Sequence, residues 1–154
     1  MLDRLKAFLF GMDEDGAARP LKTDTDGRLE LVISSGGGIY RRTFQFFLSG
    51  TLAAGASPQR IPNVTGGSLS ILSVRLDVAT PPTGQALVVD VNKNGVTIFT
   101  TQANRPQVAA GASSGSSSNI DVTAWADGEY LHFDIDQVGS GTAGADLTVT
   151  VVVG

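Results

Sequence analysis

Hydrophobic and polar side chains alternate along the C-terminal half of the chain. Between Glu129 and Val138 the apolar residues Leu131, Phe133 and Ile135 alternate with polar ones, the pattern of a strand that buries one face. The same alternation recurs over Leu69 to Ala79, Ala86 to Asn92 and the final stretch 147–153. The side chains expected to face a common core are Leu72, Val74, Leu76, Val78, Leu87, Val89, Val91, Leu131, Phe133, Ile135, Leu147, Val149, Val151 and Val153.

Turn signals separate these stretches at short spacing. Asn94-Gly95 favours a hairpin because both residues readily take positive φ, and Asp127-Gly128 marks another turn. Val96 to Thr101 is expected to return antiparallel, and Asn119 to Ala124 to form a further short strand. Residues 102–119 are poor in large apolar side chains and predict a long flexible loop. The pattern predicts an all-β fold, an antiparallel β-sandwich or jelly-roll-like domain.

The N-terminal residues carry apolar groups that they cannot bury alone. We expect an extended N-terminal arm over residues 1–38, with a short amphipathic helix over 2–12 and a strand over 28–33, ahead of a sandwich domain over 39–154. Such a short helix is marginal by itself, so it either packs on its own domain or binds a partner. The run Gly36 to Gly38 predicts a flexible joint between the arm and the domain. The arm and adjoining side chains expected to bind a partner are Leu2, Leu5, Phe8, Leu9, Phe10, Met12, Leu29, Leu31, Ile33, Arg41 and Arg42.

The segment Ile39 to Leu48 predicts a strand with apolar side chains on both faces. Phe44, Phe46 and Leu48 share one face, whereas Phe47 points the other way. A strand of this kind either is central in a sheet or lies against another chain.

Composition excludes several classes of chemistry. The 154 residues suffice for one domain with an arm, and no run of about 20 apolar residues that would span a membrane occurs. Cysteine is absent and His132 is the single histidine, which argues against the common zinc sites. A net charge of −4 and a pI near 4.7 argue against binding nucleic acid through a basic face. We expect no metal, no cofactor, no nucleic-acid partner and no membrane partner.

Candidate catalytic residues are few. His132 lies beside Asp134, but the sequence lacks the G-x-S-x-G turn that would present a serine nucleophile. Asp134 and Asp136 share a strand face, with Asp90 close by, as a carboxylate pair for glycoside hydrolysis would. A solvated surface, or carboxylates paired with Lys or Arg, is the simpler interpretation. We expect that the protein is not an enzyme, and a small hydrolase is the alternative from this class.

Two more motifs have both a functional and a structural interpretation. Asn63-Val64-Thr65 matches a glycosylation sequon, a triplet that is also common by chance. Trp125 and Tyr130 are aromatic side chains of the kind that stack on a sugar. The simpler role for Trp125 is a rim residue that packs under a loop.

Three motifs resemble a β module common in virion proteins of tailed bacteriophages. They are DVNKNG at 90–95, ADGEYL at 126–131 and DIDQVGS at 134–140, and the resemblance covers about 80 residues within 71–153. The stretch PLKTDTDGRLELVI at 20–33 is similar to the short openings of small phage head proteins.

The resemblance, with the size and the arm, implies a capsid decoration (cement) protein. Such a protein is made in the host cytoplasm, binds the major capsid protein on the virion exterior and stabilises the shell against the pressure of packaged DNA. The resemblance also implies a homotrimer that contacts neighbouring trimers. The alternative is a phage tail or fibre-tip module for receptor or glycan binding, with residues 111–118 and Trp125 facing the glycan.

Overall fold

The computed structural model describes residues 10–12, 18–20 and 41–154. The chain divides into two compact units, Met1–Gly38 and Ile39–Gly154. In the first unit β1 (Phe10–Met12) pairs antiparallel with β2 (Ala18–Pro20).

This pairing corrects the helix expected over 2–12 at its C-terminal end. The backbone of residues 10–12 pairs across a strand ladder with 18–20 instead of within a helical turn. The rest of that segment, the strand expected over 28–33 and the glycine joint lie outside the described residues.

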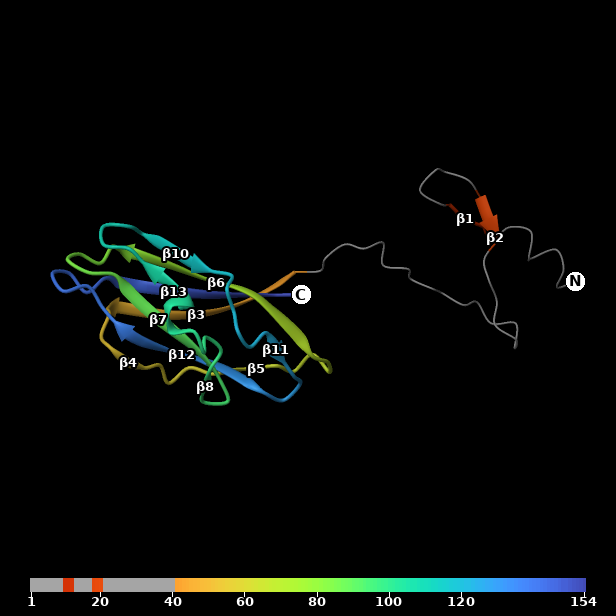
Figure 1. Cartoon of the computed structure of the whole chain (residues 1–154). Helices are drawn as coiled ribbons and strands as arrows, with labels where there is room; N and C mark the ends of the chain where they lie inside the picture. The colour runs from red at the N-terminus through yellow and green to blue at the C-terminus, as the bar shows by residue number, and fades with distance from the viewer. Residues whose placement is uncertain (1–9, 13–17, 21–40) are drawn as a thin grey trace, which may run out of the picture. The chain divides into compact units, whose positions relative to one another are not determined.

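The second unit is a sandwich of two antiparallel sheets, which face each other in Figure 1. The first sheet has the order β10-β6-β13-β3, with β11 pairing on β6; the second has the order β4-β12-β7-β8, with β5 on β12 and β9 on β7. The strands of the first sheet are β3 (Arg42–Thr51), β6 (Leu69–Thr80), β10 (Ser114–Ser117), β11 (Ala124–Trp125) and β13 (Ala145–Val153). Those of the second are β4 (Gly55–Ala56), β5 (Ile61–Pro62), β7 (Leu87–Lys93), β8 (Val96–Thr97), β9 (Gln107–Val108) and β12 (Tyr130–Gln137). The predicted all-β sandwich class is confirmed.

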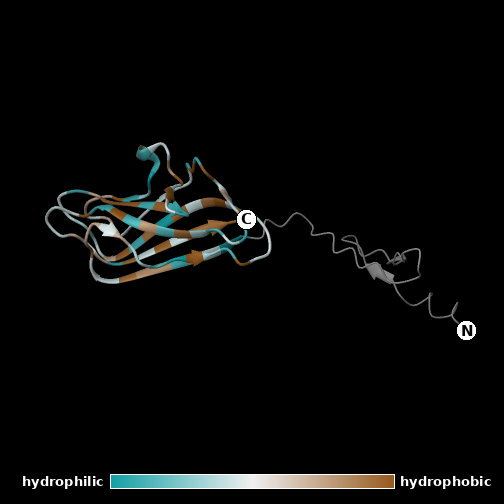
Figure 2. Cartoon of the chain, turned by 90° about the horizontal axis from the view of Figure 1, so that it is seen from below, coloured by the Kyte–Doolittle hydropathy of each residue, from teal (hydrophilic) through white to brown (hydrophobic). Residues whose placement is uncertain are grey.

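The core lies between the two sheets, where the alternating apolar side chains meet. Figure 2 shows the resulting bands of hydrophobic and hydrophilic residues along the strands. All the predicted core residues are buried except Leu72. Phe46 and Phe133 meet edge to face with ring centroids 5.4 Å apart, and Phe44 meets Trp125 in the same way at 5.0 Å. Each such contact adds about 0.5–1.5 kcal/mol to the burial of the rings.

A β-bulge explains why Leu72 is not part of the core. Val152 pairs with Ser73, whereas Val153 pairs with Ile71, so β6 carries one extra residue at Leu72. The extra residue reverses the alternation, because successive side chains point to opposite faces. Ile71 is therefore the buried residue, and Leu72 is half-buried.

Two expected strands are shorter than predicted. The hairpin at Asn94-Gly95 is confirmed, with φ of 51° and 87° at its two residues, but the return strand β8 ends at Thr97. Ile98 and Phe99 then enter the core, and the carbonyl of Ile98 accepts from the backbone amides of Asp121 and Val122. Those bonds hold 119–123 as a loop, so only Ala124 and Trp125 of this region form a strand.

Residues 102–119, predicted as a flexible loop, contain two strands and a 3₁₀ turn, η2 (Gln102–Asn104). β10 pairs with β6 along Ser114–Ser117. Gly115 lies so close to β9 that a Cβ there would collide with the carbonyl oxygen of Gln107. The absence of a side chain at Gly115 therefore allows the edges of the two sheets to approach each other on this side.

Replacing Gly115 with alanine tests this close approach. We expect Gly115→Ala to lower the free energy of unfolding by about 1–3 kcal/mol, because the new methyl group forces backbone apart in a packed region. Denaturant unfolding of the full chain measures the change. Gly67→Ala is the matched control, since a Cβ at Gly67 meets nothing within 4 Å and should leave stability nearly unchanged.

Candidate functional site

The most prominent feature for binding is the open edge of β3. Within residues 41–154, β3 pairs with β13 and with no other strand, and it is ten residues long. The strands at the edges of the second sheet, β4, β5, β8 and β9, have two residues each. Short strands leave little room for another strand to pair, whereas a long exposed strand is a template for strand addition.

One hydrogen bond shows which backbone N–H and C=O groups of β3 face the open edge. The Gln59 side-chain amide donates to the carbonyl of Phe47 over 2.7 Å, so this carbonyl points away from β13. In an antiparallel ladder the N–H and C=O of one residue point to the same side, and the side alternates along the strand. The N–H and C=O of Thr43 and Gln45 therefore also point to the open edge.

The surroundings of this edge combine apolar and basic groups. Phe47 is 55% exposed, whereas Phe46 on the opposite face is buried. Arg41 and Arg42 are exposed where the strand begins. Of the two roles expected for this strand, the central one is wrong for the described residues, because β3 is an edge strand.

The residues predicted to bind a partner are described only in part. Phe10 and Met12 belong to β1, and Arg41 and Arg42 adjoin the open edge. Those that lie outside the described residues are Leu2, Leu5, Phe8, Leu9, Leu29, Leu31 and Ile33.

Sequence reasoning missed the edge groups of Thr43, Gln45 and Gln59. The polar side chains at 43 and 45 are a signal for a solvent-facing row, but they do not distinguish an edge strand from a central one. No local pattern reveals that Gln59 reaches the carbonyl of Phe47, twelve residues away in sequence.

The second sheet carries the predicted carboxylates, which the structure assigns to different partners. Asp136 forms an ion pair with Arg105 at the bulge of β12. Asp134 accepts from the side-chain amide of Asn92 over 2.9 Å, and its other oxygen lies 3.8 Å from Nε2 of His132. The two carboxylates are thus held in separate contacts, and the expected pairing of one with a basic side chain is found at Asp136.

Asp90 lies directly opposite Asp134 in the β7–β12 ladder and is 8% exposed. The hydroxyl of Thr97 donates to Asp90 over 2.7 Å. Burial raises the pKa of Asp90 above its ordinary value of 3.8, and the nearby charge of Asp136 raises it further, whereas the Thr97 hydrogen bond opposes the shift. Within the described residues, no group of three or more His, Cys, Asp or Glu could hold a metal ion.

His132 lies on the outer face of this sheet, with a side chain that is 16% exposed. Its Nδ1 and the Asp134 Oδ1 are shielded from solvent and have no hydrogen-bond partner in the described part of the chain. The ring of Tyr130 lies 6.0 Å away, and Arg60 lies 4.6 Å over that tyrosine. His132 thus sits beside Asp134 and Tyr130 in a packed polar layer.

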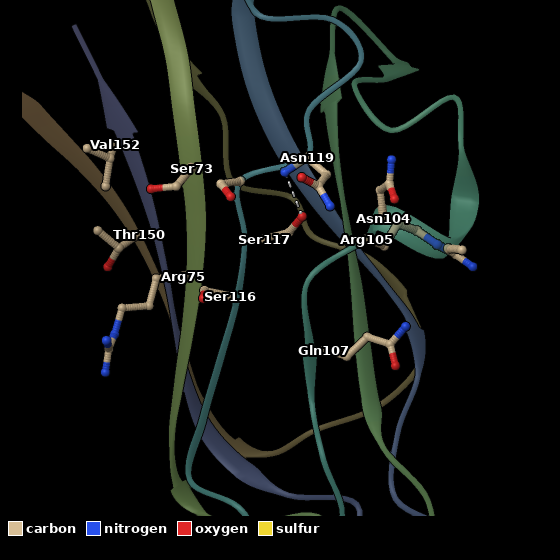
Figure 3. A pocket seen from close by; sticks show the side chains of 12 residues that line it. Ser73, Arg75, Asn104, Arg105, Gln107, Ser116, Ser117, Asn119, Thr150 and Val152 are labelled. Carbon is tan, nitrogen blue, oxygen red and sulfur yellow. Dashed lines mark hydrogen bonds between the residues drawn. The ribbon is translucent and has the colours of Figure 1, made fainter.

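An open hollow of about 590 Å³ extends across β10 and is lined by residues on both sides of this strand (Figure 3). Its side chains are mostly Ser, Thr, Asn and Gln, with Arg75 on one side of the strand and Arg105 on the other. Arg75 is paired with Asp77 at 2.8 Å, and Arg105 is paired with Asp136. No aromatic ring lines this hollow among the described residues, so it offers no stacking platform for a sugar.

Two motifs have structural roles. Trp125 is fully buried and its indole N–H donates to the carbonyl of Glu129, which excludes it as a sugar-stacking surface and places it in the core instead of at the rim. Asn63 is also fully buried, and its side-chain amide donates to the carbonyls of Gly67 and Trp125, 2.8 Å away in each case. The folded domain therefore does not present this sequon nitrogen for glycosylation.

The described residues contain no helix long and apolar enough to cross a membrane.

Comparisons with known proteins give a match among solved structures. No protein-family model matches the sequence, and no curated protein matches it. A chain in the structure titled "Cyanophage Pam1 capsid asymmetric unit" is similar to this one with a TM-score of 0.40 and 14% sequence identity. The similarity covers 88% of this chain and 98% of that chain. A likeness at this level carries no argument about function.

The raised pKa of Asp90 generates a prediction about pH and stability. Above the folded-state pKa, Asp90 is charged and desolvated in the folded protein, so Asp90→Asn should be more stable than the wild type at pH 7. As the pH falls through the folded-state pKa, the folded wild type takes up a proton before the unfolded chain does. The advantage of Asp90→Asn should therefore shrink and become constant below about pH 3.8, the ordinary value.

Thermal unfolding of both proteins between pH 3.5 and 8 measures this effect. Asp77→Asn is the control, because the pKa of Asp77 is lowered by its hydrogen bond from Arg75 and the pair is exposed. Its stability relative to the wild type should not rise with pH. An advantage of Asp90→Asn that is the same at every pH would contradict the assignment.

Proposed function

We propose that the chain is a capsid decoration protein of a tailed phage. It binds the outer shell through its N-terminal arm, the adjoining β3 offers an edge to which a further strand can pair, and the protein acts by binding instead of catalysis. The observation that carries the proposal is the long open edge of β3, which begins at Arg42, directly after the arm. A rigid domain with a strand-accepting edge next to an arm is suited to tie neighbouring subunits together.

The sequence resemblance supports the phage assignment. The DVNKNG and ADGEYL motifs lie at two turns at the same end of the second sheet, and the amide of Asn94 donates to the carbonyl of Tyr130. The two motifs are thus neighbours in the folded domain. Partners under this proposal are the major capsid protein, other copies in a homotrimer and neighbouring trimers on the virion exterior.

Under this proposal the protein acts mechanically, by holding neighbouring capsid subunits together. Each arm adds contacts that are weak alone, but a multimer engages several subunits at once, and the effective concentration of the remaining contacts slows release. The shell then resists outward pressure because these contacts must break before neighbouring capsid subunits separate.

The β domain has a core of its own, since its buried apolar side chains all come from residues 46–153. Deleting residues 1–38 should therefore leave a folded domain that no longer decorates shells. The measurement is binding to expanded shells that lack the protein, by sedimentation and electron microscopy, with circular dichroism to verify folding. Ala54→Asp in the full chain is the control, because Ala54 is exposed in a loop and should not affect occupancy. Full occupancy by the folded truncated protein would refute the role of the arm.

A further inference from the structure

The open edge of β3 has a limited free length. Its outward backbone groups at Thr43 and Gln45 have no partner within residues 41–154, whereas the carbonyl of Phe47 is occupied by the Gln59 side chain. The free stretch is therefore Arg42–Phe46. An added strand could pair along five or six residues before it reaches the side chain of Gln59.

The core is also incomplete at this edge. Phe44 and Leu48 pack against the buried cluster but are only half-buried themselves, because the first sheet ends at β3. An extra strand with apolar side chains on its core-facing side would cover Phe44. The edge thus presents both unpaired backbone groups and uncovered apolar surface, which together favour strand addition.

We propose that residues 28–33 from the arm of a second copy of this chain pair with Arg42–Phe46. The sequence predicts this segment as a strand, and it lies outside the described residues. Its six residues extend over about 20 Å, which matches the free stretch. Leu29, Leu31 and Ile33 would share one face and extend the apolar surface beside Phe44.

The arrangement of the chain favours this occupant over an unrelated peptide. Each copy carries one donor segment and one acceptor edge, separated by Gly36 to Gly38. A donor from one copy on the acceptor of the next is a head-to-tail contact, which closes into a ring when the rotation permits. The inference goes beyond shell binding, because it requires only copies of this chain.

A proline on β3 tests the pairing. Thr43→Pro removes an N–H that points to the open edge and that β13 does not use, and proline is tolerated at such edge positions. Thr43→Ala is the matched control, because it removes the side chain and keeps the N–H. Light scattering of the full chain over a concentration series measures self-association. We expect the wild type and Thr43→Ala to associate with the same dissociation constant. The dissociation constant of Thr43→Pro should be at least about tenfold higher.

Two further measurements keep the inference testable if Thr43→Pro fails to fold. Gln45→Pro alters the other outward position, and a synthetic peptide of residues 27–34 should compete with association of the wild-type chain. Equal association of the folded proline variants, no competition by the peptide, or a full chain that stays monomeric would each overturn the inference. A monomer in which hydrogen exchange shows Thr43 protected would indicate that the arm pairs with its own domain, which also overturns it.

These outcomes are distinct from those for the proposed function. Self-association that depends on Thr43 without any binding to shells would contradict the decoration role and leave the strand exchange standing. Shell binding without Thr43-dependent association would support the decoration role and overturn the strand exchange.

Discussion

The unpaired backbone edge of β3 is the constraint around which the domain is arranged. Backbone N–H and C=O groups need partners, and most edges of this sandwich are made short or brought against another strand. β9 and β10 approach so closely that glycine is required at 115. At the other edge of the first sheet, β3 keeps its outward groups at Thr43 and Gln45 unpaired within residues 41–154. The arm, residues 1–38, precedes this strand in the sequence.

The polar layer on the second sheet arises because the β7–β12 ladder brings the DVNKNG and DIDQVGS motifs together. β7 and β12 place Asp90 opposite Asp134, a juxtaposition of like charges that destabilises a sheet. Thr97, Asn92 and Arg105 each bind one carboxylate in the cluster. The acidic residues that resemble a catalytic pair are thereby bound by hydrogen bonds and an ion pair within the domain.

The alternation of apolar and polar residues predicted the buried side chains correctly where the strands are regular. The residues of β7, β12 and β13 that the pattern assigned to the interior are all buried. It failed at Leu72 because a single bulge exchanges the faces of β6, and nothing in the local sequence marks that residue as extra. It failed over Ser114–Ser117 because a serine-rich segment has no apolar periodicity, although the neighbouring edge of β6 supplies its hydrogen-bond partners.

The sequence by itself determined the fold class, the hairpins and most of the core, because side-chain alternation and turn chemistry are local properties. Only the tertiary structure decided which strand lies at an edge and which motifs are buried. Trp125 and Asn63 look like binding residues in the sequence, yet both are fully buried, with hydrogen bonds to backbone carbonyls. Edge position and burial depend on contacts between residues far apart in the chain, such as Gln59 with Phe47 and Asn63 with Trp125, and no local pattern records them.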